Sequence, residues 1–251
     1  MRTYLHSLKI FALGISPTFL MLSGLPAIEP AQSQSFPEMV ARLSFPKGSD
    51  RGGPRRTSGG GKRGAACDEP SAVEEVSERE LPLTAIMPEN NLGTTTKGNP
   101  NIYIYVPPNN NKNAEFVIFD LTNIEETYED NFALPPEGGI IKLVLPEKAQ
   151  LQVGNEYQWH FGIICDADDE TQHEVVQGLL EKNTPINLEK IQEEKNLLEK
   201  ADLYAQAEVW NETLDIAAKL RDSDPNPWLE LLTSVGLENF IEQPIVEIPL
   251  D

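Results

Sequence analysis

Short runs of apolar and β-branched residues alternate with polar residues through the middle of the chain, over residues 81–183. Clusters of proline, asparagine and glycine, such as 107–111 and 135–139, separate these runs. Short strands with a turn about every dozen residues are typical of an immunoglobulin-like antiparallel β-sandwich. We therefore predict a mainly β domain of this kind over residues 81–183. The predicted strands are 83–87, 102–106, 115–121, 127–133, 140–145, 156–165 and 174–182.

The most aromatic of these strands begins near Tyr157. In sandwich folds a tyrosine at the start of the sixth strand bonds back to the backbone just upstream, and we expect Tyr157 to do so. Alternation along the strand then buries Trp159, Phe161 and Ile163 on the same face as Tyr157 and turns His160 toward solvent. An aromatic-rich strand in another β fold would alternate in the same way.

The spacing of apolar residues changes to the period of an α-helix over residues 184–240, and residues 241–251 are interpreted as a tail. We predict a short helical hairpin or three-helix segment that packs against the sheet. Proline at a helix start and glycine just past a helix end define the last helix. The expected boundaries are Asn187 as the first N-cap, 210–220 for the second helix, and Asn226 to Gly236 for the third.

The first residues have the features of an export signal. Two basic residues precede an apolar stretch of secretory length, and Ala31 and Ser33 fit a small-x-small cleavage site. An uncleaved anchor would need about 20 continuous apolar residues, and Pro17 and Pro26 interrupt this stretch. We predict a signal peptide over residues 1–33, export to the periplasm or the outside, and no membrane span once the signal is removed.

Residues 34–80 show no sustained apolar period. They are rich in glycine and arginine at first and acidic later, and such a segment buries too little apolar surface to offset the entropy of ordering. We expect a flexible, extended arm here.

The charge of the chain is divided along its length. The chain has 251 residues with 40 acidic and 20 basic side chains, a net charge of −20. Residues 1–63 carry nine basic and three acidic side chains, so the remainder is strongly acidic. An acid excess of this size disfavours nucleic acid as a partner, because a polyanion would be repelled.

Five basic residues of the arm are the candidate partner-binding element. They could hold an unknown envelope protein or polymer of negative charge, or they could fold back onto the acidic body. Both alternatives remain open from the sequence. The five residues are Arg51, Arg55, Arg56, Lys62 and Arg63.

Cys67 and Cys165 are the two cysteines of the chain. Outside the cytoplasm a pair of cysteines more often forms a disulfide than binds a metal, so we predict a Cys67–Cys165 bond. The bond would close a long loop and stabilise the fold by roughly 4–5 kcal/mol in the loop-entropy model. Two free thiols are the alternative.

The sequence lacks the common motifs for nucleophilic catalysis and nucleotide binding. The chain has no Gly-x-Ser-x-Gly elbow, and the glycine-rich run 59–63 departs from the phosphate-binding loop. We therefore predict no catalytic residues, no cofactor and no metal. An acidic cluster is a weak calcium candidate, but it departs from the calcium-loop pattern and is better interpreted as a solvated turn. That cluster is Asp166, Asp168, Asp169 and Glu170.

Several short motifs resemble, in order, those of a cyanobacterial secreted family, domain of unknown function 928. They begin with 53–56, 61–64 and Cys67, and the resemblance covers roughly residues 51–237. The chain departs from the family pattern at Glu208, where glycine is more usual. The resemblance implies an exported protein without an assigned activity and carries over no catalytic residues.

From these observations we predict an exported, non-enzymatic binding or interaction module of the cell envelope. Two alternatives stay open: an envelope hydrolase that uses paired carboxylates, and a structural subunit of an envelope assembly. The many acidic residues of the body allow a carboxylate pair, but its geometry cannot be read from spacing alone.

Overall fold

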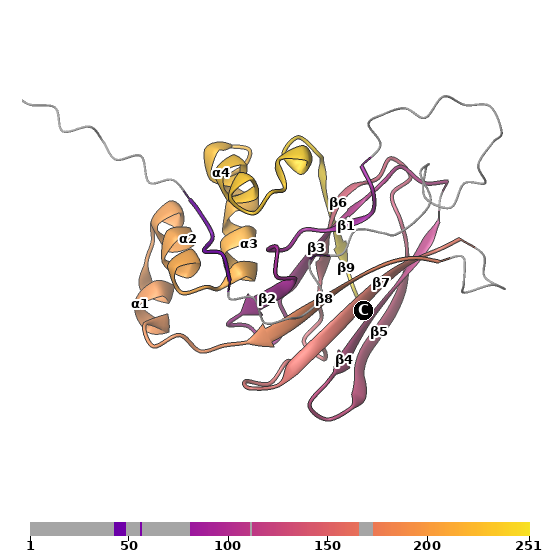
Figure 1. The fold of residues 1–251 in the computed structure, drawn as a ribbon, viewed down its shortest axis with the longest axis horizontal. Helices are drawn as coiled ribbons and strands as arrows, with labels where there is room; N and C mark the ends of the chain where they lie inside the picture. The colour runs from indigo at the N-terminus through magenta and orange to yellow at the C-terminus, as the bar shows by residue number, and fades with distance from the viewer. Residues whose placement is uncertain (1–42, 49–55, 57–80, 111, 166–172) are drawn as a thin grey trace, which may run out of the picture. The chain divides into compact units, whose positions relative to one another are not determined.

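Nine strands form two sheets in the computed structural model, which describes residues 43–48, 56, 81–110, 112–165 and 173–251. We call the four-stranded sheet, in the order β1-β3-β6-β9, sheet A, and the five-stranded sheet, in the order β2-β8-β7-β4-β5, sheet B. Figure 1 shows the course of the chain through both sheets. Sheet A contains β1 (Thr84–Ala85), β3 (Asn101–Val106), β6 (Gly139–Val144) and β9 (Ile245–Pro249). Sheet B contains β2 (Leu92–Thr95), β4 (Asn113–Asp120), β5 (Glu125–Ala133), β7 (Glu156–Ile164) and β8 (Glu174–Lys182).

A mainly β fold with a helical segment after it is therefore confirmed, and each of the seven predicted strands is present. Two further strands, β2 and β9, were not predicted. β2 pairs in parallel with β8, and β9 pairs in parallel with β6, so both sheets are mixed, with antiparallel pairing elsewhere. The segment expected to be a tail, 241–251, thus supplies an edge strand of sheet A. Both missed strands are short, and Gly93 and Pro249 weaken their β pattern.

A hydrophobic core fills the space between the two sheets. The inward residues of β7 are all buried, as predicted: Tyr157, Trp159, Phe161 and Ile163. The Tyr157 hydroxyl accepts a hydrogen bond of 2.9 Å from the backbone N–H of Gln152, five residues upstream. The predicted tyrosine corner is confirmed, and it fixes the turn that leads into β7.

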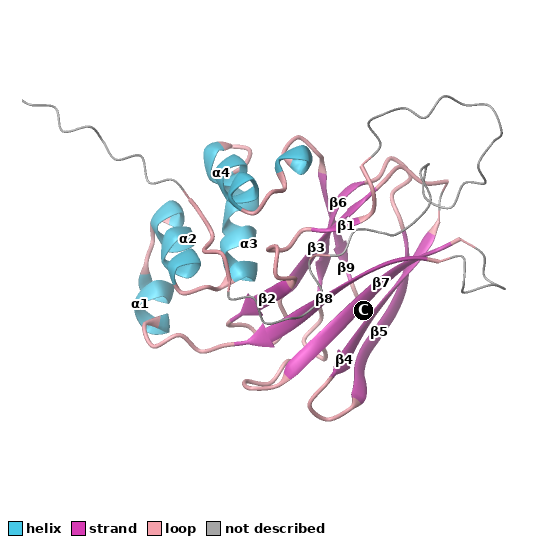
Figure 2. Cartoon of the chain, viewed as in Figure 1, coloured by secondary structure: helices cyan, strands magenta, loops and turns pink. Residues whose placement is uncertain are grey.

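The helices form a further layer. Alternate residues of β3 divide between two cores: Ile102 and Ile104 face sheet B, whereas Tyr103 and Tyr105 pack with the helices. Figure 2 shows the helices together beside β2 and β3, away from β4 and β5. None of the helices in the described residues is long and apolar enough to cross a membrane. The helices are α1 (Leu188–Glu193), α2 (Leu197–Gln206), α3 (Trp210–Leu220), α4 (Asn226–Ser234) and the short 3-10 helix η2 (Glu238–Phe240).

The first predicted helix is divided into α1 and α2. Asn187 is the N-cap residue of α1, as expected, but its side chain makes no cap hydrogen bond. Asn196 is the N-cap residue of α2, and its side chain accepts from the N–H groups of Leu198 and Glu199. The predicted second and third helices correspond to α3 and α4.

Residues 43–48, assigned from the sequence to the flexible arm, pack on the helical layer. Leu43 and Phe45 are buried, and the Phe45 ring lies edge-on to Trp210 with 5.0 Å between centroids. The backbone N–H of Leu43 donates to Glu230 and that of Phe45 to Ser234. The expectation of an arm that is extended and unpacked throughout is therefore wrong for these residues. Two alternating apolar side chains are too few to produce a periodic signal.

Candidate functional site

Arg56 is the one residue of the predicted basic tract that the structure describes. Cys165 directly follows β7, but Cys67 is outside the described residues, so the disulfide stays a prediction. The remaining basic candidates and the acidic cluster also lie outside them: Arg51, Arg55, Lys62, Arg63, Asp166, Asp168, Asp169 and Glu170.

The Arg56 guanidinium is bound by the chain's own backbone. Its Nη1 donates to the carbonyl oxygens of Met87 at 3.0 Å and Val235 at 2.9 Å, and its Nη2 donates to Gly236 at 3.2 Å. Two of these acceptors follow the last turn of α4, where the helix dipole favours a cation. Burial lowers the pKa of Arg56, and the charges of Glu89 and Glu238 oppose that shift. Arg56 therefore binds the folded part of its own chain, which was one of the two alternatives for the basic tract; the other was binding of a partner.

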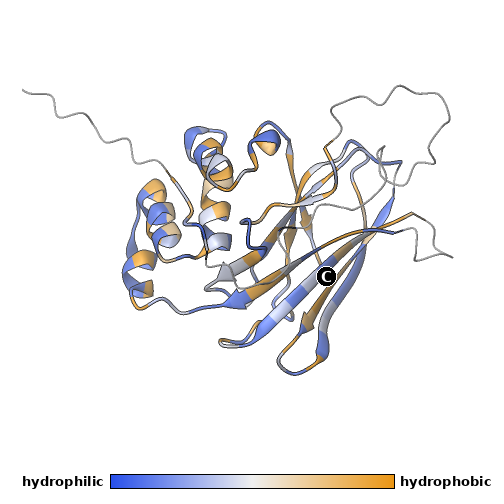
Figure 3. Ribbon diagram, in the orientation of Figure 1, coloured by the Kyte–Doolittle hydropathy of each residue, from blue (hydrophilic) through white to orange (hydrophobic). Residues whose placement is uncertain are grey.

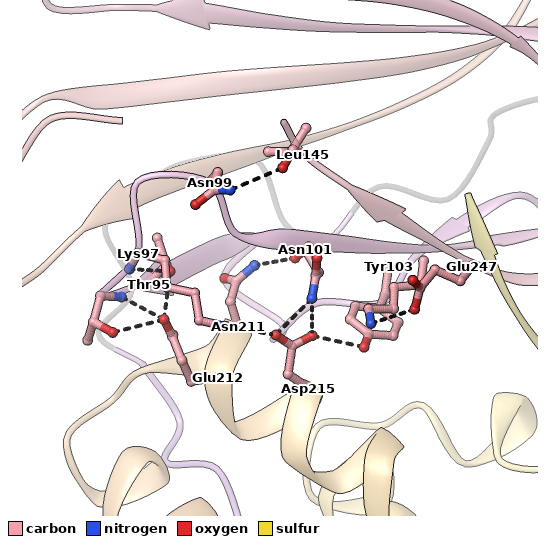
Figure 4. A network of polar contacts seen from close by, with 12 residues as sticks. Thr95, Lys97, Asn99, Asn101, Tyr103, Leu145, Asn211, Glu212, Asp215 and Glu247 are labelled. Atoms are coloured by element: carbon pink, nitrogen blue, oxygen red, sulfur yellow. Dashed lines mark hydrogen bonds and ion pairs between the residues drawn. The ribbon is translucent and has the colours of Figure 1, made fainter. Parts of the chain in front are cut away.

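A polar network joins α3 to the two sheets, and Figure 4 shows it from close by. Glu212, in the first turn of α3, is buried. Its Oε1 accepts from the Thr95 hydroxyl at 2.9 Å, and from the Thr96 backbone N–H at 3.0 Å and hydroxyl at 2.9 Å. The carboxylate therefore ties the helix to the end of β2.

Asp215 lies one helical turn beyond Glu212. Its carboxylate accepts from Asn101 Nδ2 at 2.9 Å, from the Tyr103 hydroxyl at 2.9 Å and from Lys97 Nζ at 3.3 Å. Burial, and then the charge of Asp215, raise the pKa of Tyr103. Tyr103 accordingly stays protonated and remains a donor to Asp215, which holds α3 on β3.

Glu212 and Asp215 are two carboxylates of α3 whose partners could not be identified from the sequence. Their spacing of three residues on α3 puts them on one helix face, but their donors come from residues more than a hundred positions earlier. Three donors from the chain converge on one oxygen of Glu212, and Asp215 accepts from three side chains. This is the arrangement of an anchor between a helix and two sheets.

A second candidate site is the outer face of sheet B. Ala114, Phe116 and Ile118 of β4 point into the core, so the intervening residues of β4 point outward. The pairing register then places His160 of β7 beside Val117. The outward apolar residues of this face are Val117, Phe119, Val175 and Leu179.

His160 lies on the outward side of β7, as the alternation predicted. Its ring packs edge-on to Phe119 with 5.7 Å between centroids. Burial lowers the pKa of His160, so its surroundings favour the neutral imidazole. In the outward position His160 belongs to the apolar centre of this face.

Acidic residues line the β5 side of the same face. β4 and β5 together carry six acidic side chains and no basic ones. β5 is the edge strand of sheet B, and Figure 3 shows much of it as hydrophilic. By the pairing register, Glu115, Glu126 and Glu129 lie on this outer face. The other three acidic residues, Asp120, Glu125 and Asp130, stand at positions in register with the inward residues Tyr157 and Phe116.

The tip of the β4–β5 hairpin is held by Asp120. Its Oδ1 accepts from the backbone N–H groups of Thr122 and Asn123, and its Oδ2 from the side chain of Asn155 at 2.8 Å. Burial alone would raise the pKa of Asp120, but these hydrogen bonds together lower it. The ordered tip presents Ile124, which has a φ of 58° and is 91% exposed. A positive φ is rare for a β-branched residue, and the hairpin holds an apolar side chain outward at that cost.

Comparison with known proteins gives one match. The family described as a domain of unknown function, DUF928, matches residues 58–245. The chain belongs to this family. No curated protein and no solved structure matches this DUF928 chain.

The position at which this DUF928 chain departs from the expected glycine, Glu208, has a φ of 56°. It lies between α2 and α3, and its carbonyl accepts from the hydroxyl of Thr94. The same hydroxyl accepts from the N–H of Trp210 at 2.9 Å. Glycine enters the left-handed region without a steric penalty, which gives a physical reason for glycine at this point.

Proposed function

We propose that the protein is an exported, non-enzymatic interaction module that binds a partner protein through the outer face of sheet B. The observation that carries the proposal is the composition of this face, with an apolar centre at Phe119 and Val175 and an acidic side at Glu126 and Glu129. Val175 is 45% exposed. An apolar centre with a charged rim is the usual composition of a protein interface.

Charge complementarity specifies the partner. Glu115, Glu126 and Glu129 lie on this face, and β4 and β5 carry no basic side chain, which favours a protein surface with lysine or arginine around an apolar centre. Such a partner would associate faster at low salt, because the charges on both rims are screened as ionic strength rises. Nucleic acid and anionic lipid would be repelled.

The edge of β5 favours contact through side chains over addition of a strand. The register of the β4–β5 pair shifts at Ile118 and Phe119, which marks a β-bulge that twists the edge. The N–H of Asn131 is already bonded to the side chain of Asp130 at 2.8 Å. Charges and bulges of this kind protect sheet edges from pairing with another strand.

The proposal is tested by site-specific photo-cross-linking in the intact envelope. We expect a defined cross-linked partner when the photoreactive residue replaces Val175. The double variant Glu126→Lys/Glu129→Lys should abolish this product, because it reverses charge on the acidic side.

The matched control is Glu189→Lys/Glu193→Lys, which reverses two exposed charges on α1. It should leave the product unchanged. Equal loss of the product with both double variants, or no product from position 175, would overturn the proposed interface.

Export and the disulfide are part of the same proposal. A cleaved leader ending near Ser33 and a Cys67–Cys165 bond both suit an extracytoplasmic module. Mass spectrometry of the full chain expressed in a secreting host should give a mature N-terminus near residue 34 and a linked pair of cysteine peptides. Alkylation of both cysteines without prior reduction would exclude the bond.

A further inference from the structure

A small cavity lies where α3 meets the two sheets. Its walls include Trp159 from β7, Gly93 from β2, and Trp210 and Asn211 from α3. The space open to the centre of a water-sized sphere is about 10 Å³. That volume is close to the minimum needed for one water molecule and is too small for a larger ligand.

Two polar atoms of residues that line this cavity have no hydrogen-bond partner within the described residues. They are the indole Nε1 of Trp159, which is a donor, and the amide Oδ1 of Asn211, which is an acceptor. Both residues are more than nine-tenths buried. The Asn211 amide is fixed because its Nδ2 donates to the backbone carbonyl of Asn101 at 2.8 Å. A buried donor or acceptor without a partner destabilises the folded state, so a shared partner is favoured.

The surroundings of Gly93 and Gly178 show that Asn211 and Trp159 both lie close to the side chain of Met87. A Cβ added to Gly93 would lie 3.0 Å from Asn211 Oδ1 and 3.3 Å from the terminal methyl carbon of Met87. A Cβ added to Gly178 would lie 2.6 Å from both the sulfur of Met87 and the indole Cε2 of Trp159. The Asn211 amide oxygen therefore lies near the methyl end of the Met87 side chain and the Trp159 indole near its sulfur, and all three residues line the same cavity.

We propose that this cavity binds one structural water molecule. The water accepts from Trp159 Nε1–H and donates to Asn211 Oδ1, so it supplies the partner that each atom lacks. It joins a strand of sheet B to α3 at the point where α3 also contacts sheet A. The site does not depend on the proposed interaction face, and its test is independent of any partner.

The other two tryptophans are internal controls in one measurement. The indole N–H of Trp210 donates to the Ile86 carbonyl at 3.2 Å, and that of Trp228 donates to the Ile241 carbonyl at 3.0 Å. In ¹⁵N-labelled full chain, we expect a direct water cross-peak in nuclear and rotating-frame Overhauser spectra at Trp159 Hε1. The other two indoles should show none or a much weaker one. A Trp159 indole with no water cross-peak would overturn the proposal.

Two glycine variants test the location. Gly93→Ala puts a methyl group beside Asn211 Oδ1 and should remove the Trp159 cross-peak while the other two indole signals keep their positions. Gly162→Ala is the matched control on the opposite face of sheet B, since its Cβ would meet its nearest neighbour, Val175, at an ordinary 3.7 Å. A cross-peak that survives Gly93→Ala in a folded protein would exclude this cavity as the site, as would a crystal structure of the full chain with no density between the two atoms.

Discussion

Sheet A and sheet B share one core but differ on their outer faces. β3 and β6 of sheet A are buried on both sides, because the helices cover the outer one. β5 and β7 of sheet B alternate between buried and more exposed positions. The sequences show the same difference: 101–106 and 139–144 are nearly continuous apolar runs, whereas 125–133 and 156–161 alternate. A strand covered on both faces has no polar side. A continuous apolar run therefore indicates a strand buried on both faces, and alternation indicates a strand buried on one face.

The test with the largest expected effect on stability substitutes one outward residue on each sheet. Ile140→Ala on β6 should lower the free energy of unfolding by about 2–5 kcal/mol, because Ile140 is fully buried under the helices. Val175→Ala on β8 should change it by less than about 0.5 kcal/mol, because Val175 is substantially exposed. Urea unfolding of both variants measures the difference. Equal losses would contradict the assignment of a covered and an uncovered face.

The next test concerns the polar anchor of the helical layer. Glu212→Leu removes the acceptor for Thr95 and Thr96, and leaving buried donors unpaired should cost about 1–3 kcal/mol. Glu212→Gln keeps an acceptor oxygen and should cost less. Glu193→Leu on the exposed side of α1 is the control, with an expected change within about 0.5 kcal/mol. An unchanged unfolding midpoint for Glu212→Leu would show that the network does not hold α3 in place.

The third test concerns Asp120, which holds the tip of the β4–β5 hairpin in sheet B, the sheet whose outer face the helices do not cover. The pKa of Asp120 is lower in the folded chain than its ordinary value of 3.8. The stabilisation is therefore complete above pH 3.8 and is lost as the pH falls through the lower, folded-state value. Asp120→Asn should remove this contribution, so the variant should lose less stability than the wild type when the pH falls from 6 to below 3.8. Thermal unfolding at a series of pH values measures the two slopes, and parallel slopes would contradict the role of Asp120.

The smallest expected effect is at the turn between α2 and α3. Glu208→Gly should raise the free energy of unfolding by about 0.5–1 kcal/mol. A left-handed backbone costs about 1–2 kcal/mol in a residue with a side chain, and glycine avoids this cost. The net gain is smaller because glycine loses more conformational entropy when the chain folds. Gly154→Ala is the converse variant, at a φ of 87° with open space around it, and should be destabilising. Chemical denaturation of both variants gives the signs. A destabilised Glu208→Gly would show that the side chain of Glu208 is needed in this turn.

The features that could be predicted from the sequence are those with local periodicity. Alternation identified the inward face of β7, and the position of Tyr157 at the start of that strand predicted its hydrogen bond to the backbone just upstream, at Gln152. The carboxylates of α3 could not be paired with their donors, because Glu212 meets Thr95 only after the chain has folded. β2 and β9 were missed for the same reason, since a short parallel edge strand is defined by its neighbour more than by its own sequence.

The pairing of β9 with β6 has a consequence for the order of folding. Ile245 pairs with Ile140, so sheet A cannot be completed until the residues after α4 have emerged from the ribosome. Leu250, just beyond β9, is buried in the core between the sheets. Closing such a distant contact is slow, and the edge of β6 stays unpaired while the chain is being made. Until residues 245–249 are available, the nascent chain therefore keeps an exposed strand edge on β6 that is prone to pairing with other chains.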